Sequence, residues 1–265
     1  MTLTIRPEHA RELARLRQHT ARPDFVLIGA AALGHHVPLP RKTNDVDLAL
    51  VVRPDEIEAL LTSLGWRRDA TIQQRWYGPD DFRADVLPAT PELLAVGSVS
   101  FDRDTRSMSL VGFDLAFEHA VDVELPGSPS TVKVASLAAI VVLKTVAWLD
   151  RPHERTRDLG DLATVFRVAL AEDDERRWGT HTVATSGLDF DDQSPFFVGL
   201  EVSAIVRPVH RARLDELVAK LLDDGPHAAL MARAANLRGE DPDLLARRMV
   251  EMFARGLRHA DGASR

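Results

Sequence analysis

The sequence contains no cysteine, so it can form neither disulfide bonds nor a thiolate metal site. It also lacks an apolar run long enough to cross a membrane, because its most apolar helical stretch, residues 134–149, is interrupted by Lys144. No basic segment followed by an apolar run stands near the N-terminus, and no secretory signal is expected. These absences predict a cytoplasmic protein in a reducing compartment, with no membrane partner.

Positive charge is in deficit, since 33 lysine and arginine residues face 40 aspartate and glutamate residues and give a formal net charge of −7. A protein that coats nucleic acid with its whole surface is normally basic. The charge argues against that class, and an RNA partner would need a local basic patch.

Several catalytic signatures are absent as well. The sequence has no His-Glu-x-x-His, no Gly-x-x-x-x-Gly-Lys-Ser/Thr and no nucleophile elbow. His35 and His36 are adjacent, so on a helix their side chains diverge, and neither has a partner at metal-ligand spacing. Zinc-protease, P-loop and α/β-hydrolase chemistry therefore have no support in the sequence.

The 265 residues, of which 45% are hydrophobic, are enough for a sizeable core. The pattern predicts an α/β (α+β) fold, with a mixed sheet and flanking helices over 1–134 and a helical, bundle-like domain over 135–265. Strands are expected at 24–28, 45–52, 71–77, 82–87, 114–118, 121–125 and 131–134. Helices are expected at 7–18, 30–35, 54–64, 135–149, 157–170, 195–206, 208–222 and 243–257, with a loop over 178–194.

The most informative segment joins the apolar strand 24–28 to a small-residue turn that begins with Gly29 and opens a helix. The next strand carries Asp45 and Asp47 at its start. Alternate residues of a strand project from one face, so the two carboxylates point the same way. Most Asp-x-Asp pairs are solvated surface residues, but this pair follows closely on a turn whose backbone N–H groups suit a phosphate. The combination indicates a divalent metal that carries a polyphosphate, which is nucleotide chemistry.

A third carboxylate would complete a site for two metal ions, which lie roughly 3.5–4 Å apart in enzymes of this chemistry. Asp85 is the candidate because it interrupts the apolar strand 82–87, where a carboxylate without a cation is costly. The alternative interpretation is an aspartate on an edge strand that pairs with Arg83 or another arginine.

Lys144 is the single lysine on an otherwise apolar helix, and Asp158 and Asp161 follow on the next one. The two aspartates are three residues apart and share a helix face. A lone lysine of this kind often extends its ammonium group to solvent, and the aspartates would then form a surface network. If Lys144 instead faces the metal site, it would neutralise charge on the β- and γ-phosphates.

Three segments carry a family resemblance: Ile28-Gly29-Ala30-Ala31-Ala32-Leu33, Arg41-x-Thr43-x-Asp45-x-Asp47, and Lys144 with Arg157-Asp158-Leu159-Gly160-Asp161-Leu162. Their order and spacing resemble the DNA polymerase β-like nucleotidyltransferase superfamily. Within it they look like the AbiEii/AbiGii group, known mainly as toxins of bacterial toxin–antitoxin pairs.

The resemblance implies a nucleoside triphosphate donor and Mg²⁺, as two ions, with Mn²⁺ as an alternative. Asp45 and Asp47 would be metal ligands, joined by Asp85 from its strand position. Gly29 and Thr43, with their neighbours Ala30 and Arg41, would border the triphosphate, and Lys144 and Asp161, with Asp158, would complete the nucleotide pocket. In the superfamily the turn usually reads Gly-Gly or Gly-Ser, whereas Ala30 here lacks the hydroxyl and keeps the backbone donor.

The first hypothesis is an enzyme that moves a nucleotidyl group from an NTP to a hydroxyl of RNA, with tRNA as the expected acceptor. Its catalytic residues would be Asp45, Asp47, Asp85 and Lys144, and a cognate antitoxin would be its protein partner. A second hypothesis keeps the chemistry with an aminoglycoside-type acceptor, which the acidic net charge favours because cationic compounds seek acidic clefts. A third is a non-catalytic partner-binding protein on the same scaffold, for which Ala30 is the main support.

Overall fold

The computed structural model describes residue 3 and residues 5–19, 24–40, 43–100, 107–178, 183 and 186–263. Contacts within the chain divide it into two compact units, Met1–Ile140 and Val141–Arg265. The division falls inside helix α6 (Leu137–Asp150), whereas the sequence pattern places a boundary just ahead of this helix, between residues 134 and 135. The predicted mixed α/β class is confirmed, and every strand of the described residues lies in the first unit.

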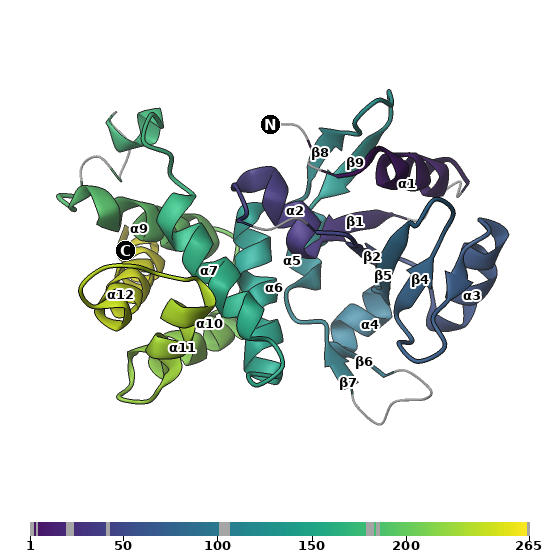
Figure 1. Cartoon of the computed structure of the whole chain (residues 1–265). Helices are drawn as coiled ribbons and strands as arrows, with labels where there is room; N and C mark the ends of the chain where they lie inside the picture. The colour runs from purple at the N-terminus through teal and green to yellow at the C-terminus, as the bar shows by residue number, and fades with distance from the viewer. Residues whose placement is uncertain are drawn as a thin grey trace. The chain divides into compact units, whose positions relative to one another are not determined.

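The first unit is built on a seven-stranded mixed sheet with the order β3-β4-β5-β2-β1-β9-β8 (Figure 1). Its strands are β1 (Phe25–Ile28), β2 (Val46–Leu50), β3 (Arg67–Arg68), β4 (Arg75–Tyr77), β5 (Arg83–Pro88), β8 (Val121–Glu124) and β9 (Thr131–Val134). β2 is the middle strand, antiparallel to β1 and parallel to β5. Its apolar residues Val46, Leu48 and Leu50 are fully buried, which leaves the opposite face of the strand to Asp47.

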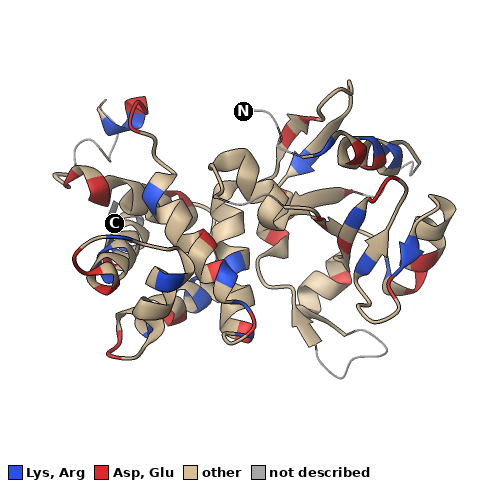
Figure 2. Ribbon diagram, in the orientation of Figure 1, with Lys and Arg blue, Asp and Glu red and all other residues tan. Residues whose placement is uncertain are grey.

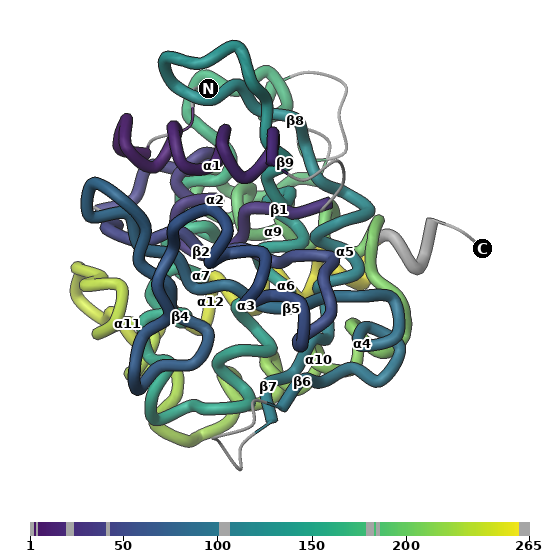
Figure 3. The backbone as a smooth tube through the Cα atoms, turned by 90° about the vertical axis from the view of Figure 1, so that its right-hand side faces the viewer, coloured from purple at the N-terminus to yellow at the C-terminus, as the bar shows by residue number. Residues whose placement is uncertain are grey.

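Five further helices and a small pair of strands are seen among the described residues of this unit. They are α1 (Pro7–His19), α2 (Gly29–His36), α3 (Pro54–Ser63), α4 (Pro91–Val96), α5 (Phe113–Glu118), and the paired strands β6 (Ser98–Ser100) and β7 (Ser107–Ser109). α2 packs on β1 and β2, and α1 packs beside β9 (Figure 3). On α1, the carboxylate of Glu12 accepts hydrogen bonds from Trp66 at 2.8 Å and from Arg15 at 2.7 Å, so polar contacts fix this helix as well as apolar ones.

The second unit is helical. Beyond α6 its described helices are α7 (Thr156–Val168), the 3-10 helix η1 (Glu175–Arg177), α9 (Phe190–Ser203), α10 (Pro208–Leu222), α11 (His227–Ala234) and α12 (Pro242–Ala263). α9 and α12 pack closely together (Figure 1). A Cβ atom on Gly199 would lie 2.2 Å from the carbonyl oxygen of Phe253, and one on Gly256 would lie 2.1 Å from that of Phe196. The two helix backbones therefore touch at these glycines.

One predicted element is wrong, and one predicted helix begins too late. Residues 114–118 form α5 rather than a strand, because the N–H of Ala116 donates to the carbonyl of Gly112 at 3.1 Å and closes a helical turn. The apolar alternation of Phe113, Leu115 and Phe117 imitates a strand pattern. Helix α9 begins at Phe190 and not at Pro195, with acidic residues in its first turn as helix starts favour, so the predicted loop 178–194 is shorter.

Membrane insertion has no structural support. None of the helices in the described part of the chain combines the length and apolar character that a bilayer span requires.

Candidate active site

Asp47 lies on β2 with its carboxylate against the first residue of α2. The antiparallel pairing of β1 and β2 sets Ile28 opposite Asp47, and Gly29 follows Ile28 directly. A Cβ atom on Gly29 would lie 2.0 Å from Asp47 Oδ2, and Gly29 has a φ of +66°, in the left-handed region. Both facts require glycine at this turn. The fold thus places a carboxylate beside the positive end of a helix dipole.

Asp85 shares the face of Asp47. The parallel pairing of β2 and β5 makes these two residues register partners. Ala84 and Val86, the neighbours of Asp85 on β5, are buried on the other face of the sheet. Since paired residues of adjacent strands project from the same face, the carboxylates of Asp47 and Asp85 stand side by side across the two strands.

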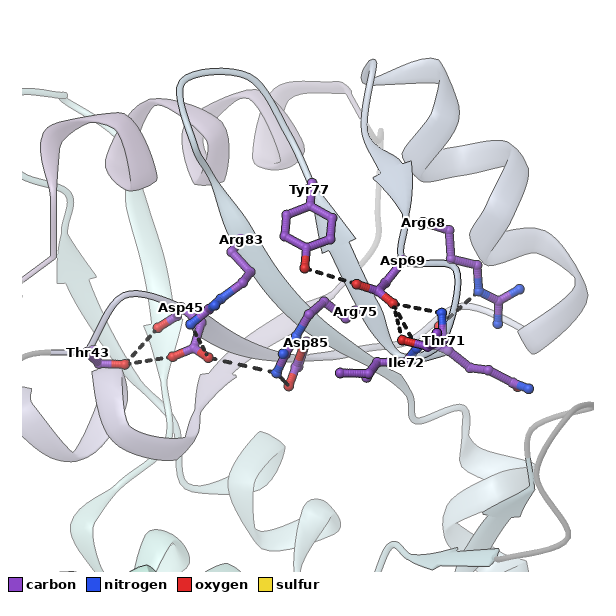
Figure 4. Close-up of polar contacts among 11 residues, drawn as sticks. Thr43, Asp45, Arg68, Asp69, Thr71, Ile72, Arg75, Tyr77, Arg83 and Asp85 are labelled. Carbon is purple, nitrogen blue, oxygen red and sulfur yellow. Dashed lines mark hydrogen bonds and ion pairs between the residues drawn. The ribbon is translucent and has the colours of Figure 1, made fainter.

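Asp45 belongs to the same group and is held by three polar contacts (Figure 4). Thr43 Oγ1 donates to Asp45 Oδ1 at 2.9 Å, and Arg83 Nη2 donates to Asp45 Oδ2 at 3.1 Å. Arg75 Nη2 lies 4.0 Å from the same Oδ2 atom. These contacts fix the carboxylate of Asp45 in place next to two guanidinium groups.

Arg75 is the link between Asp45 and Asp85. Its Nε and Nη2 atoms donate to the two oxygens of Asp85 at 2.8 and 2.9 Å, a bidentate geometry. The hydrogen bonds with Asp85 raise the pKa of Arg75, which stays charged. The alternative interpretation, an aspartate on an edge strand that pairs with an arginine, is therefore correct about the arginine. It is wrong about the edge, because β5 lies between β4 and β2.

A second ionic cluster lies in the other unit, where Lys144 of α6 meets Asp158 and Asp161 of α7. Lys144 Nζ is 2.9 Å from Asp158 Oδ1 and 2.7 Å from Asp161 Oδ2. Burial by itself would lower the pKa of Lys144, but the two carboxylates outweigh it and raise that pKa. The side chains are buried, so an ammonium extended to solvent and a surface network of aspartates are both wrong.

The candidate residues therefore fall into two groups. Within the first unit, the structure gathers Gly29, Ala30, Thr43, Asp45, Asp47 and Asp85. Within the second unit, it joins Lys144, Asp158 and Asp161. Arg41 lies outside the described residues.

The family model described as "Nucleotidyl transferase AbiEii toxin, Type IV TA system" matches residues 11–256 of this chain. This chain belongs to the AbiEii family. The resemblance seen in the sequence is confirmed, and the protein is a nucleotidyltransferase of a family assigned to type IV toxin–antitoxin systems.

Two solved structures show a loose likeness to this AbiEii protein. JHP933 from Helicobacter pylori is 14% identical, with 97% of this chain and 94% of that chain covered and a TM-score of 0.40. An antigenic nucleotidyltransferase-like protein from Paracoccidioides brasiliensis is 15% identical, with 86% and 94% covered and a TM-score of 0.42. No curated protein matches the chain.

The donor chemistry of this AbiEii site suits a hard divalent cation, because Asp45, Asp47 and Asp85 offer carboxylate oxygens on one face. Across the described residues, however, no three His, Cys, Asp or Glu side chains converge as ligands of one ion. Both oxygens of Asp85 accept from Arg75, which occupies the position of a competing cation. The carboxylate ligands are of the type that Mg²⁺ prefers, but in this structure Arg75 and Arg83 neutralise the charges of Asp85 and Asp45.

Sequence reasoning missed Arg75 and Tyr77, which stand on the same sheet face as Asp85 and Arg83. The signal was the alternation in Arg75-Trp76-Tyr77, where Trp76 is almost fully buried and its neighbours must therefore face the other way. Which carboxylate Arg75 would meet depends on strand register, and a single sequence does not give register.

Proposed function

We propose that this AbiEii protein transfers a nucleotidyl group from an NTP to a hydroxyl of RNA, with tRNA as the expected acceptor and Mg²⁺ or Mn²⁺ as the metal. One observation carries the proposal: Asp47 and Asp85 are register partners beside the Gly29 turn, in a chain of a nucleotidyltransferase family. The acceptor and the metal dependence are what the experiments below test.

The reaction forms a bond between the acceptor hydroxyl oxygen and the α-phosphorus of the NTP. The bond from that phosphorus to its bridging oxygen breaks, and pyrophosphate leaves with the bonding electrons. Backbone N–H groups at the start of α2, from Gly29 and Ala30, would donate to the phosphates. Asp85 is the proposed acceptor of the hydroxyl proton.

Asp45, Asp47 and Asp85 would hold the metal, which when bound supplies charge neutralisation and lowers the pKa of an attacking hydroxyl. Thr43 would keep the carboxylate of Asp45 oriented, as it does here at 2.9 Å. The family resemblance also gives Lys144 and Asp161 a part in catalysis, and that part stays a prediction.

The direct test replaces Asp47 with Asn and measures incorporation of labelled NTP into total RNA in the presence of Mg²⁺. We expect loss of incorporation by at least about a thousandfold, since one ligand of a phosphoryl-transfer metal is removed. The matched control is Asp122→Asn, an exposed aspartate on β8 at the far edge of the same sheet, which should keep wild-type activity. Wild-type turnover by folded Asp47→Asn protein would refute the site.

An aminoglycoside-type acceptor is the second candidate, and the net charge of −7 favours it because such compounds are cationic. The same assay with an aminoglycoside panel in place of RNA separates the two. Transfer to a drug but not to RNA would establish the second candidate. Absence of NTP binding with Mg²⁺ present would favour a non-catalytic scaffold.

A further inference from the structure

The sheet order sets the two guanidinium groups on the opposite side of β2 from helix α2. Gly29 follows β1, which flanks β2 on one side, whereas Arg83 and Arg75 lie on β5 and β4 on the other side. Displacement at phosphorus is in line, so the attacking oxygen and the leaving pyrophosphate lie on opposite sides of the α-phosphate. If the triphosphate lies at α2, the acceptor approaches from the arginine side.

The same sheet face continues from the carboxylates to the edge of the sheet as two rows of side chains. One row holds Asp47, Asp85 and Arg75, which are register partners across β2, β5 and β4. Trp76, which precedes Tyr77 on β4, is buried on the other face of the sheet.

The second row continues from Arg83 to Tyr77 and then to Arg67, across β5, β4 and β3. With about 4.8 Å between neighbouring strands, the two steps from Arg83 on β5 to Arg67 on the edge strand β3 span about 10 Å. This is long enough for more than one nucleotide.

Tyr77 is held in place at the middle of this row. Its hydroxyl group donates to Asp69 Oδ2 at 2.9 Å, as Figure 4 shows. Asp69 also accepts from the backbone N–H groups of Ile72 and Thr71, and these bonds hold the pKa of Asp69 well below its usual range. The carboxylate of Asp69 therefore accepts hydrogen bonds from its own loop and from Tyr77. These bonds hold the ring of Tyr77 at its position between Arg83 and Arg67 in the row.

Arg67 ends the row with an exposed guanidinium group. Its Cζ atom is 5.3 Å from the centroid of the Tyr77 ring, and within the described residues it forms no ion pair. Figure 2 shows basic segments on β4 and β5 in a chain that is acidic as a whole. An aromatic ring between guanidinium groups suits a base that stacks and phosphates on both sides of it.

We propose that Arg83, Tyr77 and Arg67, with Arg75 beside them, form the binding face for a single-stranded RNA end that serves as acceptor. A phosphate of the RNA pairs with Arg67 and a base stacks on Tyr77, while Arg83 and Arg75, which are paired with Asp45 and Asp85, set the positive charge at the inner end of the face. The inference rests on the proposed function, since it uses the side of β2 from which an acceptor must come. A polycationic acceptor would meet arginines of its own charge on this face.

The test measures RNA binding in the absence of NTP, so that it does not depend on catalysis. A fluorescent single-stranded RNA of about ten nucleotides, within the usual site size, is titrated by anisotropy at several salt concentrations. Tyr77→Ala should weaken binding roughly tenfold through loss of stacking, and Tyr77→Phe, which keeps the ring, should restore it. Arg67→Gln should lower the salt slope of the binding constant by about 1.

The matched control is Arg53→Gln, an exposed arginine paired with Asp55 beyond the far end of β2, which should bind RNA as wild type does. Arg67 makes no ion pair among the described residues, so its replacement should leave folding intact. Wild-type affinity and salt slope in both Tyr77→Ala and Arg67→Gln would overturn the inference, as would absence of RNA binding by the wild type. Failure of the proposed function differs, because NTP transfer would then be absent while RNA binding still depends on Tyr77 and Arg67.

Discussion

Each unit of the molecule contains a cluster of aspartates held by basic side chains, and the two clusters differ in access to water. In the first unit, the side chains of Arg75, Asp85 and Asp45 are 21, 19 and 29% exposed. In the second unit, Lys144, Asp158 and Asp161 are 8, 11 and 8% exposed. Arg83 also pairs with Asp45 in the first cluster, and Arg155 lies 3.6 Å from Asp158 in the second. The open cluster can exchange an arginine for an incoming cation or phosphate at modest cost, whereas the closed cluster depends on its lysine for stability.

The strongest way to break this comparison is Lys144→Met. It removes the buried ammonium group from Asp158 and Asp161 and leaves Asp158 only the longer, 3.6 Å pair with Arg155. We expect a loss of about 3–5 kcal/mol in the free energy of unfolding, measured by urea denaturation. Arg75→Met in the open cluster should lose less than about 2 kcal/mol, because water can solvate Asp85. A matched surface control is Lys133→Met, which removes a 3.4 Å pair with Asp24 and should lose at most about 1 kcal/mol. Equal losses for Lys144→Met and Arg75→Met would contradict the contrast.

Gly29→Ala sharpens the comparison, because it alters the open cluster without removing a charge. The added methyl group must displace the carboxylate of Asp47, so we expect a loss of roughly 2–4 kcal/mol in stability together with loss of NTP transfer. Gly65→Ala is the control: its φ of +78° carries a similar backbone cost, but nothing lies within 4 Å of the new methyl group. The difference between the two variants measures the contact with Asp47. A Gly29→Ala protein as stable as Gly65→Ala would show that Asp47 moves away freely.

The smallest effect concerns His9 of α1, which is buried near the open cluster. Burial, with the positive charge of Arg6, lowers the pKa of His9 from its ordinary value of 6.5. The unfolded chain therefore binds the proton more readily, and stability should fall as pH drops below about 6.5, by at most about 1.4 kcal/mol per pH unit.

His9→Phe cannot take up the proton and keeps an aromatic ring against Phe82, so the pH dependence of unfolding should become shallower. His35 and His36 also have lowered pKa values, through burial first, and so part of the dependence should persist. The control His153→Gln replaces an exposed side chain. An unchanged slope in His9→Phe, measured by urea denaturation at pH 7.5 and 5.5, would contradict the assignment.

Local pattern was enough for the central part of the site. The apolar run before Gly29, and the alternation after Asp45, predict β1, α2 and β2 close to their observed bounds. The position of Asp85 beside Asp47 could not be predicted, because it depends on the pairing of β2 with β5. Contacts between residues far apart in the sequence determine that pairing.

Where prediction failed, short segments and long-range contacts were the cause. The helix α5, with only 6 residues, is too short for its period to stand out against an apparent strand alternation. The bidentate contact of Arg75 with Asp85 crosses from one strand to the next, so no sequence spacing announces it. The burial of Lys144 is accompanied by its ion pairs with Asp158 and Asp161 of α7, a contact between two helices. The sequence of α6 alone is equally compatible with a lysine that extends into water.

The contact between Gly199 and Gly256 has a consequence for how this protein can change over generations. At each position, the added atom would meet the main chain of the other helix, which no side-chain replacement nearby can move away. A larger residue at either site would need α9 and α12 to shift apart as whole bodies, and α12 is itself packed on α7 through the stacked rings of Phe253 and Phe166. A single substitution of either glycine is therefore incompatible with this packing of α9 against α12. Related proteins in which the two helices pack in the same way should keep glycine at both positions.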